Sequence, residues 1–189
     1  MKALSLLTLT LALTIPAAAQ SPSQPVTQTQ SQPPTANPSD VKSIDSILTA
    51  LYAVISGPAG DRDWPRFRSL FAKGARLTSV TKNSADHPAR LLGAEEYATL
   101  AGGYFKTHAF YENAIVNKVD RFGNIAQVFS SYESRNAPNE KPFARGINSI
   151  QLFYDQNRWY VLSILWDEET PTNPLPANLA TRTTAPVTQ

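Results

Sequence analysis

Residues 143 to 168 read FARGINSIQLFYDQNRWYVLSILWDE, and this stretch has the pattern of two long β-strands joined by a tight turn. Apolar and polar side chains alternate in it with a period close to two, which is the repeat of an extended strand. Gln156-Asn157 interrupts the alternation near the middle. The stretch therefore predicts an antiparallel hairpin with strands over 143–155 and 159–168.

A hairpin that closes between Asp155 and Arg158 pairs Arg145 with Glu168 at its far end, which gives both ends of the ladder an opposite-charge pair. In a sheet that is covered on one side only, apolar and polar residues alternate strictly, whereas these two strands carry apolar residues on both faces. We therefore expect helices on one face and a second copy of the chain on the other, in a homodimer through the sheet. The apolar residues are Ile150, Leu152, Val161 and Leu165 on one face, and Ile147, Phe153, Leu162, Ile164 and Trp166 on the other.

The residues before this hairpin complete the pattern of an α+β domain. Apolar residues recur at helical spacing in the first half, and the period changes to two from Ala109 onward. Helices followed by long antiparallel strands predict three helices packed on one sheet. The expected elements are a helix from Ser39 or Asp40 to Ile55, a helix from Asp61 or Asp63 to Gly74, a short strand 75–81, a loop 82–92, a helix 94–106, and strands 109–119 and 124–135.

The N-terminus has the three-part pattern of a secretory signal peptide. Lys2 precedes an apolar run from Ala3 to Ile15, Pro16 ends the run, and Ala17-Ala18-Ala19 offers the small residues that a signal peptidase reads. The run is too short for a permanent membrane anchor. We expect residues 1–19 to be removed and the mature protein to be exported, periplasmic or extracellular, and not bound to a membrane.

Two polar segments flank the domain. Residues 20–39 and 170–189 are rich in Gln, Ser, Thr, Asn and Pro and poor in apolar residues, so they cannot bury enough surface to offset their ordering entropy. We expect a disordered leader at 20–39 and a disordered tail at 170–189 around one domain at 40–169. The competing possibility is that Leu175 and Leu179 fold the tail back over the sheet.

The composition excludes several kinds of chemistry. The chain has no cysteine, and its two histidines are His87 and His108, so disulfides and Cys/His metal sites are not expected. The formal net charge is +2, from 17 basic and 15 acidic residues without a basic run, which leaves no electrostatic footprint for nucleic acid. We expect no metal, no cofactor and no nucleic-acid partner.

Five different short motifs are spread over residues 40–169. They are Trp64-x-x-Phe67-x-x-Leu70-Phe71, Phe110-Tyr111-Glu112, Val119-Asp120-x-Phe122-Gly123-Asn124-Ile125-Ala126, Arg145-Gly146-x-Asn148-Ser149 and Arg158-Trp159-Tyr160-Val161. In these motifs the chain resembles the nuclear transport factor 2-like superfamily, close to its SnoaL-like bacterial branch.

The resemblance implies a cone-shaped roll, in which three N-terminal helices pack on a curved, mostly antiparallel sheet with a pocket between them. It also implies dimerisation through the convex face of the sheet. Members of the superfamily include isomerases, dehydratases, polyketide cyclases and binding modules. Because one fold carries so many activities, the resemblance assigns no function.

Glu112, Tyr132 and His108 are the candidates for catalysis. If Gly123 forms a three-residue bulged turn, Glu112 lies directly opposite Tyr132, where a carboxylate beside a phenol can bind a polar group or act as a general base with a raised pKa. The structural alternative is a strand-end carboxylate satisfied by a tyrosine hydroxyl. His108 lies four residues before Glu112, a spacing of about 13 Å in a strand, so a direct pair between them needs a bend.

The candidates for ligand binding are mostly aromatic. Trp64, Tyr104 and Trp166 are expected to line an apolar pocket together with Glu112 and Tyr132, although core packing explains the three aromatic residues equally well. Asn148 is the polar candidate, because an amide in a strand covered on both faces must find a hydrogen-bond partner.

Three functions remain open from the sequence. The first is a non-catalytic exported module that binds a small, partly apolar molecule. The second is an enzyme of the isomerase, dehydratase or cyclase type that uses Glu112 with Tyr132 or His108. The third is a protein-interaction module that uses the sheet face. Two titratable groups that converge in a closed pocket would favour the enzyme.

Overall fold

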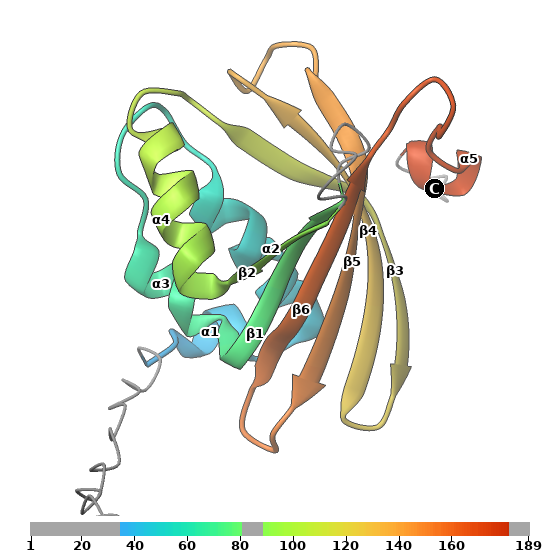
Figure 1. Cartoon of the computed structure of the whole chain (residues 1–189). Coiled ribbons are helices and arrows are strands. Elements are labelled where there is room, and N and C mark those ends of the chain that lie inside the picture. The colour runs from blue at the N-terminus through green and yellow to red at the C-terminus, as the bar shows by residue number, and fades with distance from the viewer. Residues whose placement is uncertain (1–34, 81–88, 182–189) are drawn as a thin grey trace, which may run out of the picture. The chain divides into compact units, whose positions relative to one another are not determined.

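One sheet of mixed direction carries the architecture (Figure 1). The computed structural model describes residues 35–80 and 89–181, which belong to one compact unit, Gln32–Gln189. Within these residues the strand order is β2-β1-β6-β5-β4-β3, and every neighbouring pair is antiparallel except β1 and β6. The strands are β1 Phe71–Val80, β2 Ala89–Gly93, β3 Tyr111–Phe122, β4 Ile125–Arg135, β5 Ala144–Tyr154 and β6 Trp159–Glu168.

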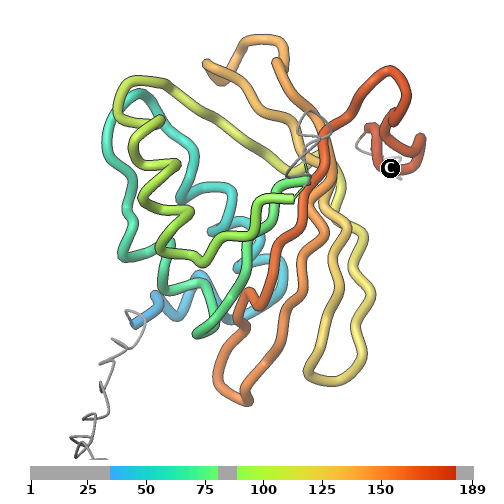
Figure 2. The backbone as a smooth tube through the Cα atoms, in the orientation of Figure 1, coloured from blue at the N-terminus to red at the C-terminus, as the bar shows by residue number. Residues whose placement is uncertain are grey.

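Helices cover one face of the sheet, as the backbone traces show (Figures 1 and 2). We call this the inner face, and the opposite one the outer face. Helices packed on a mostly antiparallel sheet confirm the predicted α+β class. The helices are α1 Pro38–Val41, α2 Ile44–Ile55, α3 Trp64–Ser69 and α4 Ala94–Phe105 on the inner side, and the four-residue α5 Ala177–Ala180 on the outer side.

The expected N-terminal helices exist, but their boundaries differ from the prediction. The helix predicted from Asp40 to Ile55 is divided, because the Ser43 hydroxyl accepts a hydrogen bond from the Ser46 amide at 3.0 Å and so begins α2. The second helix ends at Ser69 instead of Gly74, because Phe71 already pairs with Val161 of β6. The predicted loop 82–92 is wrong for residues 89–92, because Ala89–Gly93 pairs with β1 as β2.

The core lies between the inner face and the helices. The apolar stripe of α2 packs there as its spacing predicts, and Val128, Ile150 and Val161 of three neighbouring strands face it, all fully buried. No helix among the described residues is long and apolar enough to cross a membrane. The predicted signal peptide, most of the predicted leader and His87 lie outside the described residues.

A β-bulge at Leu162 shifts the register of the β5–β6 hairpin. Phe153 pairs with Tyr160 near the turn, but beyond the bulge Asn148 pairs with Trp166. The predicted ion pair of Arg145 with Glu168 is therefore wrong, and Arg145 Nη1 lies 3.3 Å from Glu169 Oε2 instead. A bulged strand reverses which face its later side chains occupy.

A second bulge, at Ile115 in β3, shifts the register of the β3–β4 hairpin. The ladder passes from Ala114↔Tyr132 to Val116↔Ser131 and leaves Ile115 unpaired. The turn is also tighter than predicted, since Phe122 pairs with Ile125 and Gly123 takes a left-handed φ of +54°. Glu112 therefore pairs with Ser134, and the prediction that it lies directly opposite Tyr132 is wrong.

The two bulges change which side chains lie on the outer face, through which the homodimer is predicted to form. Ile164 and Trp166 lie on the inner side, where Ile164 is buried in the core. The outer face carries polar side chains among its apolar ones, such as Gln127, which donates to Ser149 Oγ at 2.9 Å. The assignment of Ile164 and Trp166 to the face that dimerises is wrong, and the homodimer itself stays a prediction.

Residues 170–181 lie on the outer face and are ordered, so the predicted disordered tail is wrong for this part. Leu179 of α5 is 5% exposed, and α5 packs on β3 and β4. Arg145 holds both ends of the segment, because it pairs with Glu169 and donates from Nη2 to the Ala180 carbonyl at 2.7 Å. Folding back through Leu179 is the alternative that the sequence left open.

Truncation of the tail tests whether this contact stabilises the domain. A chain that ends after Glu169 loses the burial of Leu179, which contributes about 1.5–3 kcal/mol when complete. We expect its melting temperature to fall by about 4 °C or more in differential scanning calorimetry. A chain that ends after Thr181 keeps α5 and serves as the control. Equal melting temperatures for the two chains would show that α5 does not stabilise the domain.

Candidate functional site

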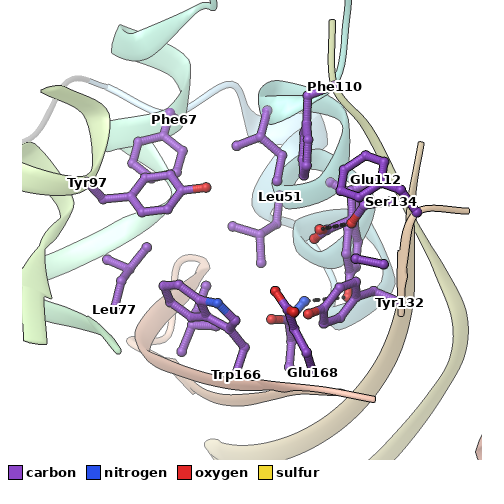
Figure 3. A pocket seen from close by; sticks show the side chains of 16 residues that line it. Leu51, Phe67, Leu77, Tyr97, Phe110, Glu112, Tyr132, Ser134, Trp166 and Glu168 are labelled. Carbon is purple, nitrogen blue, oxygen red and sulfur yellow. Dashed lines mark hydrogen bonds between the residues drawn. The ribbon is translucent and has the colours of Figure 1, made fainter. Parts of the chain in front are cut away.

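A pocket of about 230 Å³ opens between the helices and the inner face of the sheet (Figure 3). Its wall comes from α2, α3, α4 and strands β1 and β3 to β6, so most elements of the fold contribute to it. The apolar part of the wall includes Leu51, Phe67, Leu77, Phe110, Trp166 and the ring of Tyr97. The polar part consists of Glu112, Ser134, Asn148, Glu168 and the hydroxyls of Tyr52, Tyr97 and Tyr132.

Glu112 is the central polar residue of the pocket. Its backbone is fixed to the end of α2, because its amide donates to Ser56 Oγ at 2.9 Å and its carbonyl accepts from the same hydroxyl at 3.2 Å. Its carboxylate accepts a hydrogen bond from Ser134 Oγ at 2.8 Å (Figure 3). The side chain is therefore held on the pocket wall by two neighbouring elements.

The environment of Glu112 raises its pKa to about 7. Burial away from water is the largest cause, because it penalises the charged form, and the negative charge of Glu168 adds to it. Hydrogen bonds from Ser134 and Asn148 act in the opposite direction and lower the pKa. Glu112 can therefore exchange a proton near neutral pH, which an exposed glutamate does not do.

The two bulges aim these side chains into the pocket. On β3, Asn117 faces inward toward Ser130. Because side chains alternate along a strand, without the bulge at Ile115 the inward-facing residue would be Asn113 and not Glu112. On β6, Trp159 and Val161 face inward, and only the bulge at Leu162 brings Trp166 and Glu168 to the same side. Both carboxylates thus reach one cavity from opposite edges of the β3–β6 sheet.

A chain of buried hydrogen bonds forms the floor below Glu112. Asn148 Nδ2 donates to Tyr52 Oη at 3.1 Å, and Tyr52 Oη lies 2.5 Å from Ser130 Oγ. Ser130 in turn donates to Asn117 Oδ1 at 2.6 Å, so Tyr52 is the donor to Ser130. Burial, and then the charge of Glu112, raises the pKa of Tyr52, which keeps its proton in this chain. The partner that Asn148 was expected to need is therefore Tyr52.

Aromatic rings form the opposite wall. Tyr97 of α4 stacks on Phe67 with their centroids 5.3 Å apart and meets the Trp166 ring edge-on at 6.4 Å. Its hydroxyl points toward the pocket interior (Figure 3). This wall offers a ligand large apolar surfaces at a small cost in side-chain entropy.

The structure brings four of the predicted site residues together and leaves three outside. Glu112, Tyr132, Asn148 and Trp166 line the pocket. Tyr104 and His108 are both exposed and lie outside the pocket, where their rings stack with centroids 4.2 Å apart. His108 Nδ1 lies 3.0 Å from the Tyr104 carbonyl, so His108 and Glu112 form no pair. Trp64 packs against Phe67 and Phe105 beside the core and does not line the pocket.

Sequence reasoning missed Tyr52, Tyr97, Ser134 and Glu168. Tyr52 and Tyr97 each lie on the apolar stripe of a helix, and a hydroxyl on a buried stripe was a usable signal. Ser134 lies two residues after Tyr132 in β4 and so faces the same side of the sheet, which means that it too could have been predicted as a pocket residue. Glu168 lies two residues after Trp166 in β6 and faces the same side as that predicted pocket residue, so it too could have been found.

The described residues offer no metal site of the usual kind. Across residues 35–80 and 89–181, no three His, Cys, Asp or Glu side chains gather closely enough to hold a metal ion. The pocket instead combines two carboxylates with hydroxyl and amide groups on a largely apolar wall.

Comparison with known proteins gives a likeness in structure only. No protein-family description matches the chain, and no curated protein matches its sequence. A cystatin-like protein of unknown function from Nostoc punctiforme superposes with a TM-score of 0.53 at 14% identity, over 70% of this chain and 92% of that one. A nuclear transport factor 2-like protein of unknown function from Pseudomonas putida gives 0.53 at 12% identity, over 70% and 90%.

A third structure, from Parabacteroides distasonis, carries the name "putative ketosteroid isomerase" and superposes with a TM-score of 0.50 at 16% identity, over 75% of this chain and 99% of that one. Identities this low show the fold alone. The domain therefore has the nuclear transport factor 2-like fold, also called cystatin-like, in which helices pack on a curved sheet around a pocket.

The raised pKa of Glu112 makes a prediction about stability. The folded domain binds this proton more tightly than the unfolded chain, whose glutamate pKa is about 4.5. The resulting stabilisation is complete below pH 4.5 and is lost as the pH rises through about 7. Glu112→Gln has no proton to lose, so its stability should not fall over this pH range. A tenfold change in proton affinity corresponds to about 1.4 kcal/mol of unfolding free energy.

We therefore expect the unfolding free energy of Glu112→Gln to improve relative to the wild type by up to about 3 kcal/mol between pH 4 and pH 8. Urea titrations at both pH values measure this difference. The exposed Glu140→Gln is the matched control and should follow the wild type at both pH values. A constant difference between Glu112→Gln and the wild type would mean that Glu112 has an ordinary proton affinity.

Proposed function

We propose that this domain binds a small, partly apolar molecule in the pocket between helices and sheet. The observation that carries the proposal is the convergence of Glu112, Tyr132 and Glu168 on one cavity whose remaining wall is largely apolar. An apolar cavity with a few placed polar groups is the usual design of a small-molecule site, because the wall supplies affinity and the polar groups fix orientation.

The size of the pocket limits the ligand. Sites for drug-sized molecules measure roughly 300–1,000 Å³, and this one measures about 230 Å³. A molecule with a single ring and one polar substituent suits this volume. Phe143, 54% exposed, and the exposed Glu168 mark the side from which such a molecule enters.

Binding of fragment-sized alcohols tests this proposal. We expect benzyl alcohol to bind with a Kd of about millimolar, as a fragment of this size allows. Its binding should shift the amide resonances of Tyr97, Glu112 and Trp166 in two-dimensional NMR spectra. Ala144→Phe, which fills the pocket from β5, should abolish these shifts.

Ala53→Phe is the matched control, because Ala53 is exposed on α2 and outside the pocket. It should leave the shifts of the three resonances unchanged. Shifts that persist in Ala144→Phe, or that occur only on the outer face, would place the ligand elsewhere and contradict the proposal.

A second candidate function is catalysis by proton transfer on a small carbon acid. The specific observation in its favour is Glu112, whose pKa of about 7 suits a general base at neutral pH. A structural neighbour named as a putative ketosteroid isomerase has the same fold, which makes isomerisation worth testing, although a four-ring steroid exceeds this pocket. In this reading Glu112 takes the proton and the hydroxyl of Tyr132 or Tyr97 faces the developing oxyanion.

Deuterium exchange tests the catalytic candidate. The protein should accelerate exchange of the α-hydrogens of cyclohexanone in D₂O, followed by proton NMR, and the rate should rise with pH through about 7 as Glu112 becomes charged. Glu112→Gln should lower the rate about 100-fold or more. A rate equal to that of buffer, in a protein that binds the ketone, would leave binding as the function.

Further proposals rest on the sequence and the fold. We propose that the chain is exported, on the N-terminal pattern, and that it stands close to the SnoaL-like branch, on the motifs it shares with that branch. We also propose that it forms a homodimer or contacts another protein through the outer face, where Ile125, Phe129 and Leu165 remain partly exposed.

A further inference from the structure

The ionisable groups that line the pocket include acidic residues but no basic one. Glu112 and Glu168 both line it, and none of its lining residues is Lys, Arg or His. Within the described part of the chain neither carboxylate forms an ion pair; the ion pairs found there involve Asp40, Glu95, Glu133 and Glu169 instead. The protein therefore brings two carboxyl groups and no basic group to a largely apolar cavity.

Tyr132 adds a third polar group to the pocket. It is 4% exposed, and its hydroxyl forms no hydrogen bond with any described residue although it points into the pocket (Figure 3). Among the described residues no buried side-chain polar atom lacks a partner, so this hydroxyl is accessible from the pocket and can bind a ligand there. The side chain is also held in place, because a Cβ at Gly146 would lie 2.6 Å from the Tyr132 hydroxyl, and only glycine leaves it room.

The apolar wall suits a positively charged group as well. Trp166, Tyr97 and Phe110 line the cavity, and the face of an aromatic ring attracts a cation in a desolvated site. An ammonium group can donate to two carboxylates and a hydroxyl at once, whereas a neutral alcohol has one proton to donate.

We infer that the ligand of this pocket is a small organic amine in its cationic form, whose ammonium group faces Glu112 and Glu168 and donates to the Tyr132 hydroxyl. The ring or alkyl body of the amine packs against Trp166, Tyr97 and Phe110. This inference rests on the proposed binding function and adds the chemical class of the ligand to it.

Binding of a cation is coupled to the proton on Glu112. The titratable groups that face Glu112 are Glu168 from β6, Tyr132 from β4, Tyr52 from α2 and Tyr97 from α4, and no basic side chain is among them. A cation favours the charged carboxylate, so amine binding releases a proton near pH 7. A neutral ligand that accepts a hydrogen bond from the protonated carboxyl has the opposite pH dependence.

Isothermal titration calorimetry with benzylamine and its neutral analogue benzyl alcohol tests the inference. At pH 8 we expect benzylamine to bind about tenfold or more tightly than benzyl alcohol, since hydrogen bonds to charged groups are the stronger ones. The benzylamine affinity should rise about tenfold from pH 6 to pH 8, and titrations in two buffers should show proton release at pH 7.

Substitution of each carboxylate in turn shows how much it contributes to binding of the ammonium group. At pH 8, Glu112→Gln should weaken benzylamine about tenfold and Glu168→Gln about threefold, and each should change the affinity for benzyl alcohol less than it changes the affinity for benzylamine. Glu140→Gln, in an exposed loop, is the matched control and should change neither.

The two possible failures are distinguishable. If benzyl alcohol binds as tightly as benzylamine, or if benzylamine affinity does not rise with pH, the pocket binds small molecules but the amine inference is wrong. If neither compound binds up to its solubility limit, the proposed binding function fails, and the inference fails with it.

Discussion

Two β-bulges, at Ile115 in β3 and at Leu162 in β6, are the constraint on which the pocket depends. Each inserts one residue into a strand whose side chains otherwise alternate strictly, so the inward parity changes partway along the strand. Near the hairpin turns the inward residues build a dry core around Val128, Ile150 and Val161. Beyond the bulges they are Glu112, Trp166 and Glu168, and the same sheet then lines a pocket.

The pocket holds a carboxyl group where burial disfavours its charge. Ser134 and Asn148 offset part of this cost, and the hydrogen-bond chain from Asn148 through Tyr52 and Ser130 satisfies the polar groups beneath. An arginine beside Glu112 would have lowered the pKa of this carboxyl group and removed its ability to exchange a proton near pH 7. A partly uncompensated group in a cavity is typical of sites that bind or react, where local stability is lower than it could be.

The sequence predicted the element types well, because periodicity reports burial directly: the 3.6-residue stripe of α2 and the period of two in the long strands are both present as expected. It also predicted Glu112, Tyr132, Asn148 and Trp166 as neighbours of one pocket. It failed at the bulges, because Ile115 and Leu162 are ordinary strand residues without a glycine or proline to mark them, and the predicted pairs of Glu112 with Tyr132 and of Arg145 with Glu168 were wrong for that reason. Leu179 is a single apolar anchor in a polar tail, too little for composition to detect.

The bulges bring Glu112 and Glu168 into one cavity, where the charge of Glu168 acts on Glu112. Carbon-detected NMR of protein labelled at the glutamate carboxyl carbons measures this directly, by following the Glu112 resonance from pH 3 to pH 9. We expect a midpoint near 7 that falls in Glu168→Gln, because removing the second negative charge favours ionisation. A midpoint near 4.5 in both proteins would show instead that Glu112 is exposed to water and independent of Glu168.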